Sequence, residues 1–396
     1  MKLIASLLAV SVAATFALSG CGGSDDSSER SVGSLRLIGQ QILLRRSVFN
    51  NTVVGGLSGI DYDAANNRYV LISDDRTTGD SASAPHMFTA NLVFDANSFS
   101  AVNFLSTFAM RLPDGSVYPK LVVGSNPGAN VPDPESVRVD PVSGNYLWTS
   151  EGARVLSPAP AALINPFVRE IKPDGTHVRE YSLPAMFQMS AATPDVGPRN
   201  NLVFEGITVT PDRLKTVVIM EGALFQDAAA PTTTAGSVSR ITVFDRASGV
   251  AQAQYAYPVE KIQAEPSPAS SFSVNGATEI LAITNTKFLV LERSFSVGVN
   301  GNQVRLYEID TAPASNVLNM PVLAGASFTP VSKRLVLDFE TLKTRLGNNI
   351  ANLEGITFGP RLANGNDTLV VVADDNLPTA DSVTDFNQFL VFEVLR

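Results

Sequence analysis

A pair of short apolar strands recurs five times along this 396-residue chain. The clearest copy is NLVFEGITVTPDRLKTVVIMEG at residues 201–222, where a carboxylate begins one strand, a Pro-Asp turn follows, and the second strand ends on another carboxylate. Aligning the five copies superimposes Ser58, Glu135, Glu205, Glu279 and Glu354, with spacings of 77, 70, 74 and 75 residues. Such a regular period predicts a repeat architecture.

Each repeat contains four candidate strands, which are rich in Val, Ile, Leu, Phe and Thr and are bounded by Gly, Pro, Asn and Asp. This pattern predicts an all-β fold, and four strands per unit predict a β-propeller with five blades. Six blades are the alternative, if the insertion at 311–330 hides a degenerate blade. The last repeat lacks a fourth strand, and we expect residues 34–44, SLRLIGQQILL, to supply it and close the ring. Residues 35–396 then form a single domain.

The first 20 residues contain Lys2 and then the apolar run LIASLLAVSVAATFAL, which is too short for a membrane span and typical of a secretory signal. The following LSGC resembles a bacterial lipobox, which predicts that Cys21 is lipidated and that residues 21–34 form a flexible tether. The alternative is a plain signal peptide with an unrelated cysteine. We therefore expect an exported bacterial lipoprotein at the periplasmic face of the outer membrane or at the cell surface.

The charge balance argues against some partners. The chain has 29 Lys and Arg against 38 Asp and Glu, for a net charge of -9. An acidic surface repels nucleic acid and anionic lipid, so neither is an expected partner and membrane attachment falls to the lipid on Cys21. The same acidity suits a cation site, although solubility alone is the commoner reason for it.

The repeat also predicts where the carboxylates meet. In a propeller, the start of each innermost strand and the end of the next strand lie on one face of the ring. This rule gathers Glu135, Glu205, Glu279 and Glu354 around one mouth of the central channel. The strand ends on the same face carry Asp74, Asp75, Glu151, Glu221, Glu292, Asp374 and Asp375. The simpler alternative is that these acids only terminate strands.

Converging carboxylates repel one another, and a bound hard cation relieves that repulsion. Oxygen ligands on loop ends favour Ca²⁺ over Mg²⁺ or Mn²⁺. With two histidines and one cysteine in the chain, a zinc site of the usual ligands is not expected. In each Asp-Asp pair, one residue is expected to be a ligand or to brace the backbone.

Three arginines follow the ends of second strands on the same predicted face: Arg76, Arg154 and Arg293. Guanidinium groups beside a cation favour an anionic ligand such as a phosphate or carboxylate. The alternative is that each arginine only pairs with neighbouring acids. GGLSGI at 55–60 lacks the features of a nucleophile elbow, so a Ser-His-Asp hydrolase is not favoured.

The segments GGLSGIDYD, FEGI, LERSF and LEGI resemble those of the phytase-like family, which is described as having esterase-like activity. That family is similar to β-propeller phosphoesterases, and the resemblance implies action on phosphate esters with calcium. It implies a metal set of Glu135, Glu205, Glu279, Glu354, Asp74, Glu151 and Asp375. The catalytic residues that we expect are Glu205, Glu221, Arg293 and Arg76, with the two arginines balancing charge on the phosphoryl oxygens. The second repeat departs from the family pattern, because Ser136 follows Glu135 where a glycine is usual.

The expected function is thus a lipid-anchored, calcium-dependent hydrolase with a small anionic substrate, a phosphate ester. Two alternatives stay open. One is a scaffold or binding lipoprotein whose blades are held together by the ion, and the other is a calcium-dependent lactonase or carboxylesterase.

Overall fold

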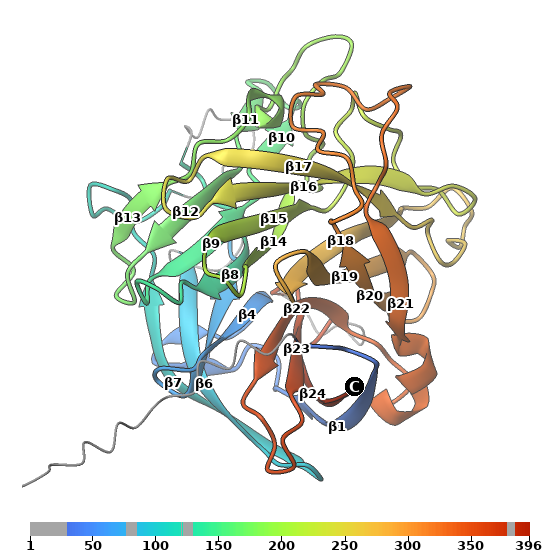
Figure 1. Cartoon of the computed structure of the whole chain (residues 1–396). Coiled ribbons are helices and arrows are strands. Elements are labelled where there is room, and N and C mark those ends of the chain that lie inside the picture. The colour runs from blue at the N-terminus through green and yellow to red at the C-terminus, as the bar shows by residue number, and fades with distance from the viewer. Residues whose placement is uncertain (1–29, 77–84, 120, 122–129, 378–384) are drawn as a thin grey trace, which may run out of the picture.

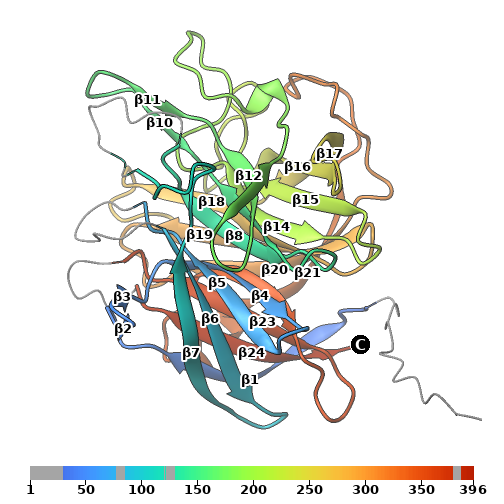
Figure 2. The ribbon, with the colours of Figure 1, turned by 90° about the vertical axis from the view of Figure 1, so that its left-hand side faces the viewer.

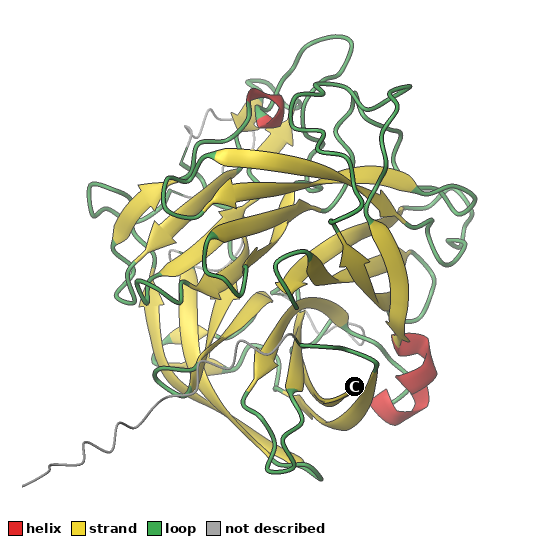
Figure 3. Ribbon diagram, in the orientation of Figure 1, coloured by secondary structure: helices red, strands yellow, loops and turns green. Residues whose placement is uncertain are grey.

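The computed structural model describes residues 30–76, 85–119, 121, 130–377 and 385–396. The predicted signal segment and Cys21 lie outside these residues. Figure 3 shows that strands dominate the molecule, with short helical turns at its periphery. Within the described ranges, no helix has the length and apolar character needed to cross a bilayer.

Five four-stranded antiparallel sheets surround a common centre, which confirms the all-β propeller with five blades (Figure 1). Blade one contains β4 (Leu57–Asp63), β5 (Arg68–Ser73), β6 (His86–Phe94) and β7 (Phe99–Ala109). Blade two contains β8 (Pro134–Val139), β9 (Tyr146–Ser150), β12 (Phe167–Ile171) and β13 (His177–Glu180). Blade three contains β14 (Phe204–Val209), β15 (Lys215–Met220), β16 (Ser237–Asp245) and β17 (Ala251–Val259). Blade four contains β18 (Ser273–Ala282), β19 (Lys287–Ser296), β20 (Gln303–Asp310) and β21 (Ser332–Asp338).

Blade five closes the ring as expected from the sequence. It contains β22 (Asn352–Gly359), β23 (Thr368–Asp374), β24 (Gln388–Leu395) and, as its outer strand, β1 (Ser34–Ile42). Ser34 lies opposite Leu395 in the β1–β24 ladder, and Arg36 Nε donates to Glu393 Oε2 at 2.6 Å. Residues just before β1 also pack on this blade, because Val32 is buried and Gly33 N donates to Leu395 O at 2.8 Å. The end of the predicted tether is thus part of the packed domain.

The insertion at 311–330 is not a sixth blade. It is an extended loop that crosses the end of blade three, where Val317 N donates to Gln254 O at 2.8 Å. A buried ion pair holds it there, because Arg240 Nε contacts Asp227 Oδ2 at 2.6 Å and Asp227 Oδ1 accepts from Leu323 N at 2.9 Å.

Short elements decorate the ring. Two hairpins, β2–β3 (Val48–Phe49 and Thr52–Val53) and β10–β11 (Ala153–Val155 and Ala162–Ile164), lie on the side where the innermost strands begin (Figure 2). Two 3₁₀ segments, η1 (Ala185–Phe187) and η2 (Phe339–Leu346), complete the described elements.

The hydrophobic core lies between neighbouring blades. Alternate side chains of each strand face the next sheet, so Val70 of blade one and Trp148 of blade two belong to one buried cluster. The ring of Trp148 meets the ring of Phe167 edge to face, with 5.0 Å between centroids. Burial of both faces of each sheet explains why the strands read as continuous apolar runs.

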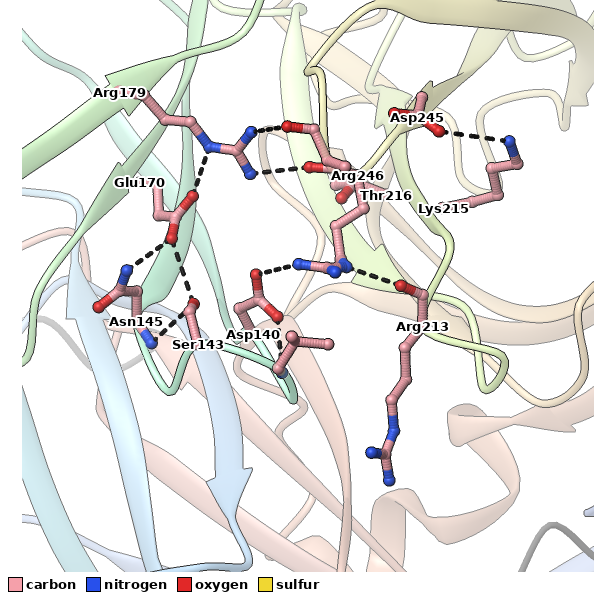
Figure 4. A network of polar contacts seen from close by, with 12 residues as sticks. Asp140, Ser143, Asn145, Glu170, Arg179, Arg213, Lys215, Thr216, Asp245 and Arg246 are labelled. Atoms are coloured by element: carbon pink, nitrogen blue, oxygen red, sulfur yellow. Dashed lines mark hydrogen bonds and ion pairs between the residues drawn. The ribbon is translucent and has the colours of Figure 1, made fainter.

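A polar network joins blades two and three at the end of the ring where the innermost strands finish (Figure 4). Arg246 Nη1 donates to Asp140 Oδ2 at 2.8 Å, and its Nε donates to Arg213 O at 2.6 Å. Arg179 Nε donates to Glu170 Oε2 at 2.6 Å and its guanidinium group also reaches the Arg246 carbonyl. Because each of these charges has an opposite partner, the network braces two blades without leaving charge unpaired.

Candidate metal centre at the channel mouth

The five innermost strands, β4, β8, β14, β18 and β22, contact one another in ring order around the channel. Each has a β-bulge where its pairing to the next strand of the blade shifts register. A bulge re-aims the side chain that it contains, and the bulges of three blades carry Glu135, Glu205 and Glu354. Ser58 occupies this place in blade one, where its hydroxyl donates to Glu135 O at 2.6 Å. The hydroxyl serves to link two blades.

Blade four corrects the alignment of the repeats by one residue. Its register shift falls between Ala277 and Glu279, so Thr278 occupies the bulge position and Glu279 takes the next one. Glycines occupy that next position in three of the other blades, at Gly59, Gly206 and Gly355. A Cβ on Gly206 would lie 2.4 Å from Ile280 N, so the innermost strands approach too closely there for a side chain.

Glu279 therefore lies inside the channel and apart from the other three glutamates. Its Oε2 contacts Arg138 Nη2 at 3.1 Å and accepts from Ser136 Oγ at 2.8 Å. Its Oε1 accepts from Ile280 N at 2.9 Å. The structure thus assigns Glu279 to an ion pair and removes it from the expected metal set, and Ser136, the departure from glycine, is one of its donors.

The Arg138–Glu279 pair fills the middle of the channel. Arg138 is 3 % exposed, and it also donates to the carbonyls of Ile60 and Ile356 at 2.6 and 2.9 Å. These contacts bind the innermost strands of blades one, four and five to the guanidinium group from blade two. Arg138 also lines a cavity of about 680 Å³ at the end of the channel where the innermost strands finish.

Eight carboxylates meet at this mouth, and we call them the carboxylate cluster. They come from the bulges, from the ends of second strands and from one preceding loop. Its members are Asp74, Asp133, Glu135, Glu151, Glu205, Glu221, Glu354 and Asp374. Oxygens of Asp74, Asp133 and Glu135 lie within 4.8 Å of one another, and so do oxygens of Glu135, Glu151 and Glu205. Four blades, all but blade four, supply the acids.

Two members were among neither the expected metal ligands nor the expected catalytic residues. Asp133 precedes β8 by one residue, and the signal for it was its place two residues before Glu135 in PDPES. Asp374 interacts with Glu354 and Asp74 across the mouth. Its neighbour Asp375, the expected ligand, instead accepts from Gly56 N at 2.8 Å and Asn387 Nδ2 at 2.9 Å. Asp375 is thus a backbone brace, and Asp374 replaces it in the cluster.

Arg76 and Arg293 border the carboxylate cluster on two sides, as expected. Arg76 contacts Asp133 and lies 3.8 Å from Glu151, whereas Arg293 lies 3.0 Å from Glu354 and 3.6 Å from Glu221. Arg154 lies elsewhere, beside Asp195 and over the ring of Phe225. Blade four also turns Glu292 outward, to Lys333 Nζ at 2.6 Å, so this blade contributes a cation to the mouth and no acid.

Burial raises the pKa of every carboxyl in the cluster. For Glu135 and Glu205, neighbouring carboxylates add to the desolvation, so the pKa of each lies well above its usual range. Desolvation raises the pKa of Glu221 to about 8 and that of Glu354 to about 7, even though Arg293 lowers both. Two guanidinium groups do not neutralise eight carboxyls, so the cluster favours an additional cation.

The donor set fits a hard divalent cation. Asp74 Oδ1 and Asp133 Oδ1 are buried and accept no hydrogen bond from the described residues. Unpaired buried oxygens are costly, and Ca²⁺ takes six to eight oxygen ligands from carboxylates and carbonyls. Asp74, Asp133, Glu135, Glu151 and Glu205 are the residues that would hold it.

Comparison with solved structures gives distant likenesses. An endo-arabinase from Bacteroides thetaiotaomicron VPI-5482 aligns with a TM-score of 0.39 and 9 % identity over 87 % of this chain and 95 % of that one. An alpha-L-arabinofuranosidase from Lactobacillus brevis aligns with a TM-score of 0.42 and 12 % identity over 86 % and 91 % of the two chains. Scores this low carry no argument about function. Comparison with curated proteins finds no match.

Comparison with protein families gives a match over most of the described domain. The matching family is the phytase-like family, described as "Esterase-like activity of phytase", and the match runs over residues 52–377. That range contains all five innermost strands and every member of the carboxylate cluster. By this match, the chain belongs to the phytase-like family.

Proposed function

We propose that this protein is a calcium-dependent hydrolase of phosphate esters that acts at the carboxylate cluster. Membership of the phytase-like family fits a hydrolase. The observation that carries the proposal is the cluster itself, in which buried carboxylates with unpaired oxygens lie between two arginines. A cation held there would supply charge neutralisation and polarise a phosphoryl oxygen.

The residues of the chain have separable roles in this proposal. Arg76 and Arg293 have side chains that are 21 % and 15 % exposed, so part of each guanidinium group reaches the mouth and can donate to phosphoryl oxygens. Glu205 lies between Glu151 and Glu221, where it would be one of the ligands of the cation. Glu221 lines the cavity beside the cluster, where its carboxyl group can exchange a proton with the bound substrate.

One experiment separates the proposal from its alternatives. Purified protein is freed of metal with a chelator, then assayed with and without added Ca²⁺ on a generic phosphate monoester, a lactone and a carboxylic ester, and its melting temperature is recorded in parallel. Phosphate release that stops in chelator and returns with Ca²⁺ is the expected result. Full activity in chelator contradicts it.

A structural role for the ion is the second candidate. The carboxylate cluster joins acids from four blades, so a cation there would also hold the ring together. If chelation lowers the melting temperature while no ester is hydrolysed at any Ca²⁺ concentration, the brace is the function of the ion. Hydrolysis of the lactone or carboxylic ester alone would indicate the other hydrolase class.

The location of the enzyme belongs to the same proposal. We propose that it is exported and held by a lipid on Cys21, at the periplasmic face of the outer membrane or at the cell surface. A Cys21→Ala variant expressed in a bacterial host is expected to leave the membrane fraction. Retention of that variant in the membrane fraction would contradict lipid anchoring.

A further inference from the structure

A cavity of about 610 Å³ opens beside the carboxylate cluster, over blades three, four and five. Its size is within the range of small-molecule sites, about 300–1,000 Å³. Glu221 and Arg293 form its border with the cluster. The rest of its lining is uncharged for the most part, with two phenyl rings and a set of asparagines: Asn200, Asn201, Asn302, Asn352 and Asn376.

The cavity has little capacity for negative charge. Among the described lining residues, Arg293 is the one cation, and it is already shared between Glu221 and Glu354. Glu221 and Asp385 add negative charge to the same wall. A phosphate held at the mouth can use Arg293, but a second phosphate on the same molecule would meet no further cation among the described residues that line the cavity. Its desolvation would therefore be uncompensated.

The amides are suited to uncharged oxygens. The side-chain oxygen of Asn201 accepts from Arg76 and that of Asn200 accepts from Arg154 N at 2.8 Å. These contacts hold the two side chains while their Nδ2 groups have no acceptor among the described residues. Amide donors and acceptors match the hydroxyl groups of a ligand, with each good hydrogen bond contributing about 1 kcal/mol.

The phenyl rings provide an apolar surface next to these amides. Phe272 is 65 % exposed, and its ring lies 6.2 Å from that of Phe295, centroid to centroid. Phe272 is the most exposed aromatic residue in the described part of the chain, and it lines this cavity. A flat ring of this kind packs well against the C–H face of a hydroxylated ring.

We propose that this cavity binds the leaving alcohol of the substrate and that it selects a phosphate monoester of an uncharged, hydroxyl-bearing ring. This inference rests on the proposed function, since it concerns the same mouth. It separates compounds that carry one phosphate from polyphosphorylated compounds, which the charge of the cavity disfavours.

The test compares two probes that differ by one phosphate, glucose 6-phosphate and glucose 1,6-bisphosphate, with Ca²⁺ present. The expected result is a kcat/KM at least about tenfold higher for the monophosphate, which corresponds to 1.4 kcal/mol. Equal or better use of the bisphosphate would overturn the inference.

Variants assign the effect to the cavity. Phe272→Ala is expected to raise the KM for glucose 6-phosphate roughly five- to tenfold with kcat unchanged, because the ring binds ground state and transition state alike. Asn376→Gly removes an amide while keeping the left-handed backbone, since Asn376 has a φ of 54°. A smaller rise in KM, roughly threefold, is expected for it. Leu214→Ala, which shortens another exposed side chain at a distant turn, is the matched control and should change nothing.

A binding measurement keeps the inference separate from catalysis. Calorimetric titration of Ca²⁺-loaded protein with glucose 6-phosphate is expected to give binding that weakens by the same factor in Phe272→Ala. If no ester is hydrolysed but this pattern of binding holds, the proposed function fails and the cavity assignment stands. If hydrolysis occurs but Phe272→Ala leaves both KM and Kd unchanged, the cavity assignment fails alone.

Discussion

The two ends of the central channel are built from the same repeat and treat charge in opposite ways. At the end where the innermost strands finish, Asp61 accepts from Thr357 Oγ1 and Val139 N, and Asp140 pairs with Arg246. At the other end, eight carboxyls meet two guanidinium groups and some of their oxygens have no partner. Balanced charge at one end serves the ring, and unbalanced charge at the other indicates a ligand.

The largest effect is expected at the boundary between the two ends. Arg138→Leu leaves Glu279 buried without its opposite charge, and breaking such a pair costs about 3–5 kcal/mol of unfolding free energy. The midpoint of urea denaturation measures this loss. A double variant, Arg138→Leu with Glu279→Leu, should recover part of the loss because no lone charge remains.

That substitution also tests whether the two ends are independent. The Arg138→Leu protein that remains folded should bind Ca²⁺ with an affinity within about threefold of the parent, since Arg138 contacts no member of the carboxylate cluster. A much weaker affinity would mean that the Arg138–Glu279 pair contributes to the metal site.

The second prediction concerns the centre of the carboxylate cluster. Glu205→Gln removes one of the carboxylates that would bind the cation. We expect the affinity for Ca²⁺ to fall roughly 100-fold, since even residues that only support a metal ligand typically contribute 10- to 100-fold. In chelator at pH 8 we expect the variant to be more stable than the parent, because it lacks a carboxyl group whose burial raises its pKa well above the usual range. The melting temperature of the variant should be lower than that of the parent in Ca²⁺ and higher in chelator. The same order in both buffers would contradict the cluster as a cation site.

The third prediction is a pH dependence of the metal-free protein. Burial raises the pKa of Glu221 to about 8 and of Glu354 to about 7, so the folded state holds these protons more tightly than the unfolded chain, whose glutamates have a pKa of about 4.3. The stability that this supplies is present at low pH and is lost as pH rises through 7 to 8. We expect the melting temperature in chelator to fall by about 5 °C between pH 6 and pH 8.5.

Calcium should reverse this trend, because the ligands bind it in their deprotonated form. In excess Ca²⁺ the melting temperature should therefore be flat or rise between pH 6 and pH 8.5. A fall of equal size with and without Ca²⁺ would show that the titrating groups are not those of the carboxylate cluster.

The smallest effect is expected from a charge at the balanced end. Arg361 lines the cavity at the end of the channel where the innermost strands finish. Its Nε lies 3.0 Å from Asp367 Oδ1, and 39 % of its side chain is exposed. Exposed ion pairs contribute about 0–1 kcal/mol. Arg361→Gln should change the melting temperature by less than about 2 °C and leave hydrolysis unaltered. A clear loss of activity would indicate that the substrate binds at the end where the innermost strands finish, which would contradict the proposed site.

The fold was predictable because the repeat specifies it at every scale. The strands alternate with turn residues at a constant period, and the incomplete last repeat together with the unassigned residues 34–44 indicated the closing strand. The meeting of Glu135, Glu205 and Glu354 at one mouth follows from the direction of the innermost strands, which any propeller imposes.

The rest of the site depends on shifts of one position along the chain, which the repeat pattern of the sequence does not resolve. In β18 the bulge holds Thr278, so Glu279 lies one residue further into the channel, although the motif places it in line with the others. The choice between Asp374 and Asp375 depends on which carboxylate the Gly56 and Asn387 donors hold. The asparagine-lined cavity has no sequence signal, because its residues come from loops and strands of three blades.

The closing strand has a consequence for the order of events during synthesis. β1 is made first, yet its partner β24 ends at Leu395, 361 residues after the start of β1 at Ser34. Until that partner emerges, β1 and β23 expose edges that can pair with other chains. A nascent or truncated chain is thus expected to aggregate, whereas the finished chain hides both edges in one step. The β1–β24 ladder can therefore form only when the chain has been made as far as β24, and a shorter chain leaves the ring open.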